Sequence, residues 1–280
     1  MTIIRTAAIL LALTIIAAVL YALRFHHTYV RDVREALAKV RYDSSLLQES
    51  DIAALPLPVQ RYIRASGAMG KPKVHAFRIT FTGRIRKNAQ TEWMPFESEQ
   101  YNTLDPPNRL FFMRAKMKGL PVSGYHHFAN SRASMDIRLL SLVRVEHQSG
   151  AVMDTAETVT FFNDMCCMAP ATLIDPRIQW KTLDTNSVLA TFTANGIRIS
   201  ATLFFNERGP LTNFISNDRY MLADDHKMIK APWSTPIRSY ADLHGSHIAS
   251  AADASYSLPT GELCYGEFRM ADVEYNPDAP

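Results

Sequence analysis

The feature that most constrains this chain is an apolar stretch near its N-terminus. From Thr6 to Leu23 it has 18 consecutive residues without a charge, bounded by Arg5 and Arg24. A helix needs roughly 20 mostly apolar residues to cross the hydrocarbon core of a bilayer, because each residue adds about 1.5 Å. We therefore expect residues 1–24 to form one transmembrane anchor.

A cleaved signal peptide is the alternative interpretation of this stretch. Signal peptides have an apolar core of about 7–15 residues and small residues at the cleavage site. The stretch here is longer, and Leu20-Tyr21-Ala22 places leucine where a small residue is preferred. A retained single-pass anchor in the cell membrane is favoured, with the membrane as a partner through residues 6–23.

The flanking charges bear on the side of the membrane that the rest of the chain occupies. Lysine and arginine are more frequent after the apolar stretch than before it, which favours a cytoplasmic domain. Acidic residues are interleaved with them, however, and large domains are translocated despite such charges. The side of the membrane stays open.

Composition excludes several function classes. Lys and Arg total 30 against 27 Asp and Glu, and no long basic block occurs, so nucleic-acid binding has no support. The three cysteines include the adjacent pair Cys166-Cys167, which does not form a disulfide framework. Gly-rich phosphate loops and a Gly-x-Ser-x-Gly nucleophile motif are absent from the sequence, and we expect no cofactor.

The remaining chain begins with helical periodicity. Residues 25–50 are expected to form a helical stalk, with Val30, Val33, Leu37 and Val40 on one face. A second helix is expected over 58–66, since Pro58 suits its first turn and Gly67 its C-terminal end.

From about residue 74 the pattern changes to strands. Residues 77–82, 111–117, 197–205 and 265–275 alternate between two faces, as antiparallel strands with one buried face do. A helix interrupts them: Asp154 and Glu157 resemble a capping box, the helix is expected to end near Met165, and a short helix follows over 171–174. This order predicts one α+β domain over residues 51–280, built on a large antiparallel sheet.

Four segments together resemble a bacterial family of domains of unknown function, whose members usually carry an N-terminal transmembrane helix. They are Leu-Pro-Leu-Pro-Val-Gln-Arg-Tyr-Ile-Arg-Ala-Ser-Gly from residue 55, Trp-Met-Pro-Phe-Glu-Ser-Glu-Gln-Tyr from residue 93, Asp-Arg-Tyr from residue 218 and Val-Glu-Tyr-Asn from residue 273. The resemblance covers about residues 50–277 and implies no activity and no catalytic residues.

A second resemblance concerns architecture only. Long antiparallel strands with short helices inserted midway are similar to the lipoprotein-carrier half-barrels of bacterial envelopes. This similarity implies a curved sheet that wraps around helices and holds an acyl chain or another apolar ligand. It also implies a location outside the cytoplasm, in conflict with the flanking charges.

Methionine and aromatic side chains are candidates for an apolar ligand pocket. Such side chains form adaptable pocket walls, although an ordinary core is the alternative for them. Asp218-Arg219 could anchor a polar group of the ligand or form a structural ion pair. The expected pocket residues are Phe111, Met113, Met117, Phe161, Phe162, Met165, Asp218 and Arg219.

Histidines and acids provide weaker candidates. His126 and His127 are neighbours on an expected strand and so point to opposite faces. His244-x-x-His247 could combine with the acidic segment Asp224-Asp225 and with His226, but no metal-binding motif is present, and we expect no metal site. Asp136, Asp154, Glu157 and Asp164 could supply paired carboxylates for acid–base chemistry.

The sequence favours a membrane-tethered binding or carrier domain for a lipid or another apolar molecule. One rival is a membrane-anchored hydrolase that uses Asp136, Asp218, Arg219 or a histidine. The other is a structural or partner-binding domain without a ligand. These observations favour a binding function over an enzymatic one.

Overall fold

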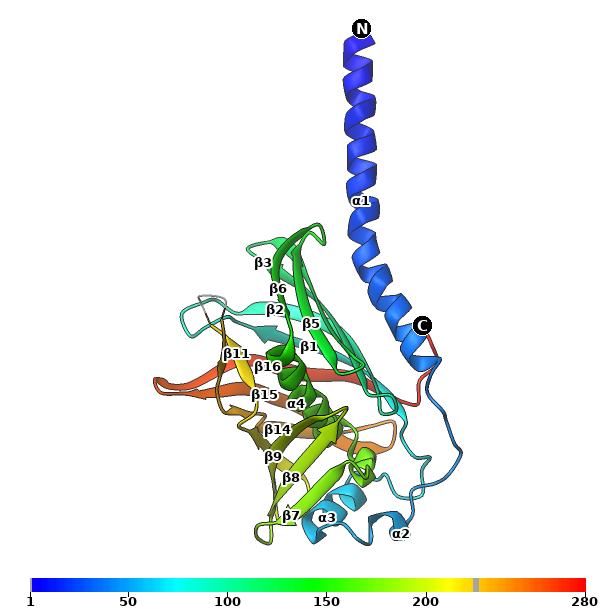
Figure 1. The fold of residues 1–280 in the computed structure, drawn as a ribbon, viewed down its shortest axis with the longest axis vertical. Helices are drawn as coiled ribbons and strands as arrows, with labels where there is room; N and C mark the ends of the chain where they lie inside the picture. The colour runs from blue at the N-terminus through cyan, green and yellow to red at the C-terminus, as the bar shows by residue number, and fades with distance from the viewer. Residues whose placement is uncertain (1, 224–226) are drawn as a thin grey trace.

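The computed structural model describes residues 2–223 and 227–280. Its main element is a large curled antiparallel sheet that forms a half-barrel around one helix, α4, while a long N-terminal helix, α1, projects from the outer side (Figure 1). The predicted α+β class with a curved antiparallel sheet and inserted helices is confirmed.

Fourteen strands of the described residues form this sheet, and all their pairs are antiparallel. The strands before α4 are β1 Ala76–Ile85, β2 Met94–Thr103, β3 Asn108–Met117, β4 Leu120–Ala129, β5 Arg132–Leu139 and β6 Val143–Ser149. Those after it are β7 Ile178–Thr182, β8 Ser187–Ala194, β9 Ile197–Phe205, β10 Leu211–Ser216, β13 Trp233–Ser234, β14 Ile237–Leu243, β15 Ser246–Leu258 and β16 Gly261–Tyr275. Their spatial order is β6-β5-β4-β3-β2-β1-β16-β15-β13-β10-β9-β8-β7, with β14 also on β15, and β11 Tyr220–Leu222 pairs separately with β12 Met228–Lys230.

The alternating segments form strands at the predicted places because each can bury one face. In β3, Phe111 and Met113 face the interior, whereas Phe112 faces outward beneath α1. The turn between β8 and β9 is Asn195-Gly196, and both residues have positive φ, as two-residue hairpin turns require.

Helix α1 spans Thr2–Leu37 without a break and joins the apolar stretch to the expected stalk. It is the one helix of the described residues long and apolar enough to cross a membrane. Its first part projects away from the sheet and leaves side chains such as Leu13 and Leu20 more than half exposed (Figure 1).

The second part of α1 packs on the convex face of the sheet. The convex-face cluster consists of Phe25, Tyr29, Val33, Ala36 and Leu37 of α1 with Ala76, Tyr101, Leu110, Phe112 and Tyr125 of the strands. The predicted apolar face of this segment is therefore confirmed. From Phe25 to Leu37, α1 is packed into the domain.

The predicted stalk helix over 25–50 is wrong beyond Leu37. The chain leaves the helix because the following segment pairs with a distant one: the Leu47 N–H donates to the Lys71 oxygen, and the Lys73 N–H donates to the Ser45 oxygen. This pairing holds Leu47 in the core, 1% exposed. Two short helices follow, α2 Glu49–Ile52 and α3 Leu57–Ala65, and α3 confirms the helix predicted over 58–66.

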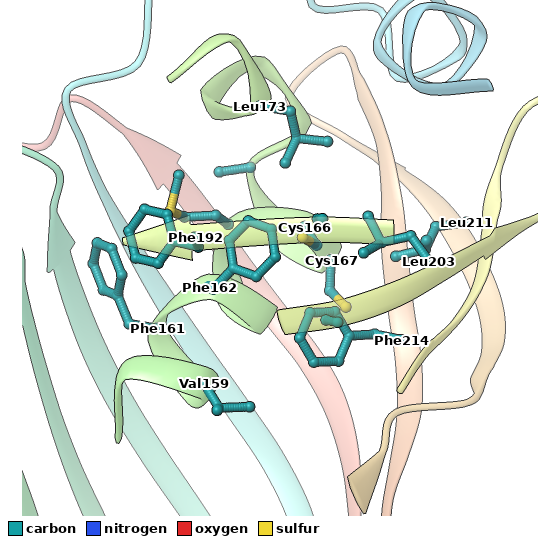
Figure 2. Packing of buried hydrophobic residues seen from close by; sticks show 14 of the residues in the cluster. Val159, Phe161, Phe162, Cys166, Cys167, Leu173, Phe192, Leu203, Leu211 and Phe214 are labelled. Carbon is teal, nitrogen blue, oxygen red and sulfur yellow. The ribbon is translucent and has the colours of Figure 1, made fainter. Parts of the chain in front are cut away.

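Helix α4, Ala151–Met168, fills the concave face, and the short helix η1, Pro170–Ile174, follows it. Side chains of α4 stack on the strands: the rings of Phe162 and Phe192 lie 5.1 Å apart and almost parallel, and Phe161 and Phe214 complete the group (Figure 2). Cys166 and Cys167 are buried in the same core, and burial raises the pKa of both thiols. They are therefore packing residues.

The predicted capping box at the start of this helix is wrong. The cap is Gly150, four residues before Asp154, and the helix begins at Ala151. Gly150 joins β6 directly to α4 with a φ of 95°, which glycine adopts readily. Asp154 instead accepts a hydrogen bond of 2.6 Å from the Ala133 N–H of β5. Glu157 points to the sheet, where it meets an arginine.

Candidate functional site

A cluster of buried charged groups joins α4 to the concave face of the sheet. Arg109 of β3 donates from Nη1 to Glu157 at 2.9 Å and from Nε to Asp164 at 2.7 Å. The two acids are seven residues apart, which places them on one face of α4. All three side chains are at most 8% exposed, so the ion pairs lie in the interior.

Amides and a histidine of the neighbouring strands complete this interior charge cluster. Gln100 and Asn102 of β2 both donate to Asp164, and Gln100 also accepts a bond from Arg109. His126 of β4 lies 3.1 Å from Glu157, whereas His127 lines the convex side. The two histidines therefore point to opposite faces, as predicted.

The surroundings of the two acids shift their pKa values in opposite directions. Burial alone would raise the pKa of Glu157, but Arg109 and His126 hold it well below its usual value. Burial raises the pKa of Asp164 despite the bonds from Arg109 and the two amides. The interior charge cluster thus depends on Arg109 to keep an ionised carboxylate away from water.

Arg219 is a second buried cation, directly before β11. It is 9% exposed, its Nη1 donates to the Tyr220 oxygen at 3.2 Å, and its Nε has no hydrogen-bond partner among the described residues. The guanidinium lies 5.4 Å from the ring centre of Trp233. Burial would lower the pKa of Arg219, but Tyr256 and other neighbours raise it, so the group is cationic.

The predicted ion pair of Asp218 with Arg219 does not form. Asp218 lies in a bend between β10 and β11, where its carboxylate accepts bonds from Ser200 of β9 and Lys230 of β12 instead. Arg219 therefore carries its charge into the interior, while Asp218 stays near the surface.

The apolar residues predicted for the pocket lie in two environments. Phe161, Phe162 and Met165 have no exposed surface, and Phe111 and Met113 are buried on the facing strand. Met117 is 44% exposed at the end of β3. The structure thus brings five of them together in the packed core between α4 and the sheet, and a ligand contact there stays a prediction.

A groove of about 490 Å³ lies on the convex side, between α1 and strands β4–β6. Its polar lining includes Arg24 and Asp32 of α1 with His127, Asp136, Arg138, Arg144 and His147 of the strands. Asp136 accepts bonds of 2.9 Å from both Arg138 and Arg144. Asp136 is therefore an ion-pair residue of the convex face, remote from Glu157 and Asp164 on the concave face.

The other candidate acids and histidines are spread over the surface. His244 bonds Asp272 at 2.8 Å, and His247 bonds Asp242 at 2.7 Å. Asp224, Asp225 and His226 lie outside the described residues.

One further group has the composition of a metal site. Asp253, Cys264 and Glu267 place ligand atoms within 4.8 Å of one another. Arg84 bonds Glu267 at 2.6 Å, and Arg238 bonds Asp253. Because arginines already neutralise both carboxylates, we describe this group as an ion-pair cluster.

Sequence reasoning missed Arg109, Gln100 and Asn102. A signal existed, since all three occupy inward-facing positions of strands where alternation calls for apolar residues. Polar residues at such positions indicate a buried partner, which here comes from α4.

Comparison with known proteins identifies the family. Residues 45–268 match a family of unknown function, DUF6544, and the chain belongs to this family. This confirms the resemblance to a domain of unknown function. The comparison with curated proteins finds no match.

Three solved structures have a similar fold. A domain named for outer membrane lipoprotein sorting, from Vibrio parahaemolyticus, has 8% identity and a TM-score of 0.39 over 71% of this chain and 85% of its own. A DUF1329 family protein from Desulfovibrio piger has 8% identity and a TM-score of 0.42 over 82% and 94%. A LolA superfamily protein from Nitrosomonas europaea has 6% identity and a TM-score of 0.36 over 80% and 93%. These similarities concern the fold alone.

Proposed function

We propose that this chain is a membrane-tethered binding domain of carrier type, which holds a lipid or another apolar molecule with an acidic head group between the sheet and α4. Helix α1 supports the tether, because its apolar part projects free of the domain while its second part is packed on the sheet. A domain held in this way meets its ligand at the bilayer.

The observation that carries the proposal is the incomplete bonding of Arg219. Among the residues that the structure describes, the Nε–H of Arg219 has lost water without gaining a partner, which costs free energy. An anionic head group would supply that partner. Met221 and Met228, on the strands that follow Arg219, pack against the core from partly exposed positions and would accommodate an apolar chain.

In this proposal α4 is the movable wall of the site. The side chains of Phe161, Phe162 and Met165 are buried. A ligand would therefore reach them, and the facing Phe111 and Met113, only when α4 shifts away from the sheet. Such a shift has to keep Glu157 and Asp164 in contact with Arg109, because separating a buried ion pair leaves its charges without a partner.

Native mass spectrometry and lipid extraction on the full chain, purified in mild detergent, test the proposal. The decisive variant is Arg219→Met, with Arg198→Met as control, since Arg198 is an exposed arginine of β9. We expect an acidic amphiphile on the parent chain and on the control, and about 10- to 100-fold less on Arg219→Met, as for loss of a charged hydrogen bond. Equal occupancy on all three chains, or none on the parent chain, would contradict the proposal.

A further inference from the structure

The junction between the apolar part of α1 and the domain is fixed by side-chain contacts. Tyr21 and Arg24, at the end of the apolar stretch, line the convex-side groove together with Arg138 and Arg144. The guanidinium of Arg138 lies 4.2 Å from the ring centre of Phe25. Arg138 on β5 therefore lies beside the residues of α1 at which the apolar stretch ends.

Two hairpin turns lie beyond this level, on the side from which α1 projects. Strand β5 ends at Leu139, one residue after Arg138, and turns into β6, while β3 turns into β4 beside it (Figure 1). If residues 6–23 cross a bilayer, both hairpin tips face its surface.

The tips expose apolar side chains that the core does not use. Met117, Leu120, Leu140, Val143 and Val145 are 44%, 49%, 45%, 59% and 46% exposed. Large apolar side chains gathered at one edge, next to a membrane-spanning helix, indicate contact with an apolar environment.

The charge of this edge is one-sided. The chain has no aspartate or glutamate from Pro106 to Met135, and within this range Arg114, Lys116 and Lys118 are exposed on the first hairpin. On the second hairpin Arg144 is already paired with Asp136, so the one-sided charge belongs to the first hairpin. A basic edge with exposed apolar residues matches the head-group region of a bilayer that contains anionic lipids.

We propose that the β3–β4 and β5–β6 hairpin tips form a second membrane contact, which places Leu120, Leu140 and Val143 in the interface of an anionic bilayer. Lys116 and Lys118 bind lipid phosphates there. This inference rests on the tether in the proposed function and adds a fixed orientation: the half-barrel lies against the membrane, and the convex-side groove opens at head-group level.

The test uses the full chain in nanodiscs with an environment-sensitive fluorophore on one introduced cysteine, in a Cys264→Ser background. Leu140→Cys reports the proposed contact. Leu183→Cys is the matched control, because Leu183 is 48% exposed and adjoins the turn that Arg61 of α3 bonds, at the end of the sheet away from the projecting helix (Figure 1). Leu13→Cys reports the insertion of α1.

We expect a label at Leu140 to shift to the blue and to be quenched by spin-labelled lipids in discs that contain phosphatidylglycerol, while the label at Leu183 stays unquenched. Lys116→Gln with Lys118→Gln, or raised salt, abolishes the effect at Leu140 and leaves quenching at Leu13 unchanged. Quenching at Leu13 with equal, water-like signals at Leu140 and Leu183 overturns the second contact and leaves the tether intact. No quenching at Leu13 overturns the tether and the second contact together.

Discussion

Both faces of the sheet are covered by a helix, but the two helices are held differently. On the concave face, α4 contributes fully buried side chains on nearly all sides and carries the interior charge cluster. On the convex face, α1 contributes one stripe of side chains, and a groove with ion pairs runs beside it. The concave contact builds the domain, whereas the convex contact attaches the domain to its projecting helix.

The difference shows where the fold tolerates change. The rings of Phe25, Tyr29, Phe112 and Tyr125 in the convex-face cluster lie 5.2 to 6.3 Å apart, within the range of favourable aromatic pairs. This cluster is small, so its loss would free α1 without unfolding the sheet. A change in the concave core would affect every strand that packs on α4.

The largest expected effect is the loss of Arg109. Arg109→Met leaves Glu157 and Asp164 buried without their cation, and we expect it to lower the free energy of unfolding by about 3–5 kcal/mol. Urea unfolding of the full chain in nanodiscs, followed by tryptophan fluorescence, measures the change. The triple variant Arg109→Met, Glu157→Met, Asp164→Leu should regain most of the loss, because it removes the charges together.

The control for this measurement is Arg198→Met on β9. Arg198 is exposed and lies outside the β3–β4 and β5–β6 hairpin tips, so its replacement should change the stability by less than about 0.5 kcal/mol. A triple variant as unstable as Arg109→Met alone would show that the cluster stabilises the concave contact by itself.

A pair of truncations compares the packing on the two faces directly. Phe162→Ala removes a ring stacked on Phe192 and is expected to cost about 3–5 kcal/mol, with faster hydrogen exchange throughout the sheet. Val33→Ala, at an equally buried position of α1, is expected to cost about 1.5–2 kcal/mol at roughly 0.8 kcal/mol per buried carbon, with faster exchange within residues 25–37. Equal costs and equal exchange patterns would mean that α1 belongs to the same cooperative unit as α4.

The strands could be predicted because their signal is local. Residues 197–205 alternate regularly and begin after Asn195-Gly196, so the sequence alone indicates the limits of β9. The end of α1 could not be predicted in this way, because the pairing of Ser45 and Leu47 with the segment at Lys71–Lys73 decides it.

The site was harder to predict than the fold for the same reason. Arg109 lies 48 and 55 residues before its two acids, and nothing near Glu157 or Asp164 in the sequence indicates the arginine. Glu157 also fits the local capping-box pattern, which predicts a role at the start of the helix rather than its long-range bond to Arg109. Long-range ion pairs follow from the topology and become visible only when β3 and α4 are placed together.

The smallest expected effect concerns a hydroxyl on the convex face. The Tyr29 hydroxyl donates to Glu99 at 3.2 Å, and Glu99 already accepts a bond of 2.9 Å from Arg78. Tyr29→Phe keeps the buried ring and leaves the carboxylate paired, so we expect a loss of about 0.5–1 kcal/mol in the free energy of unfolding. Tyr125→Phe, which removes the bond to Asp32, should behave alike in the same urea titration. A loss above about 2 kcal/mol for either variant would show that polar bonds, rather than the aromatic packing, hold α1 on the sheet.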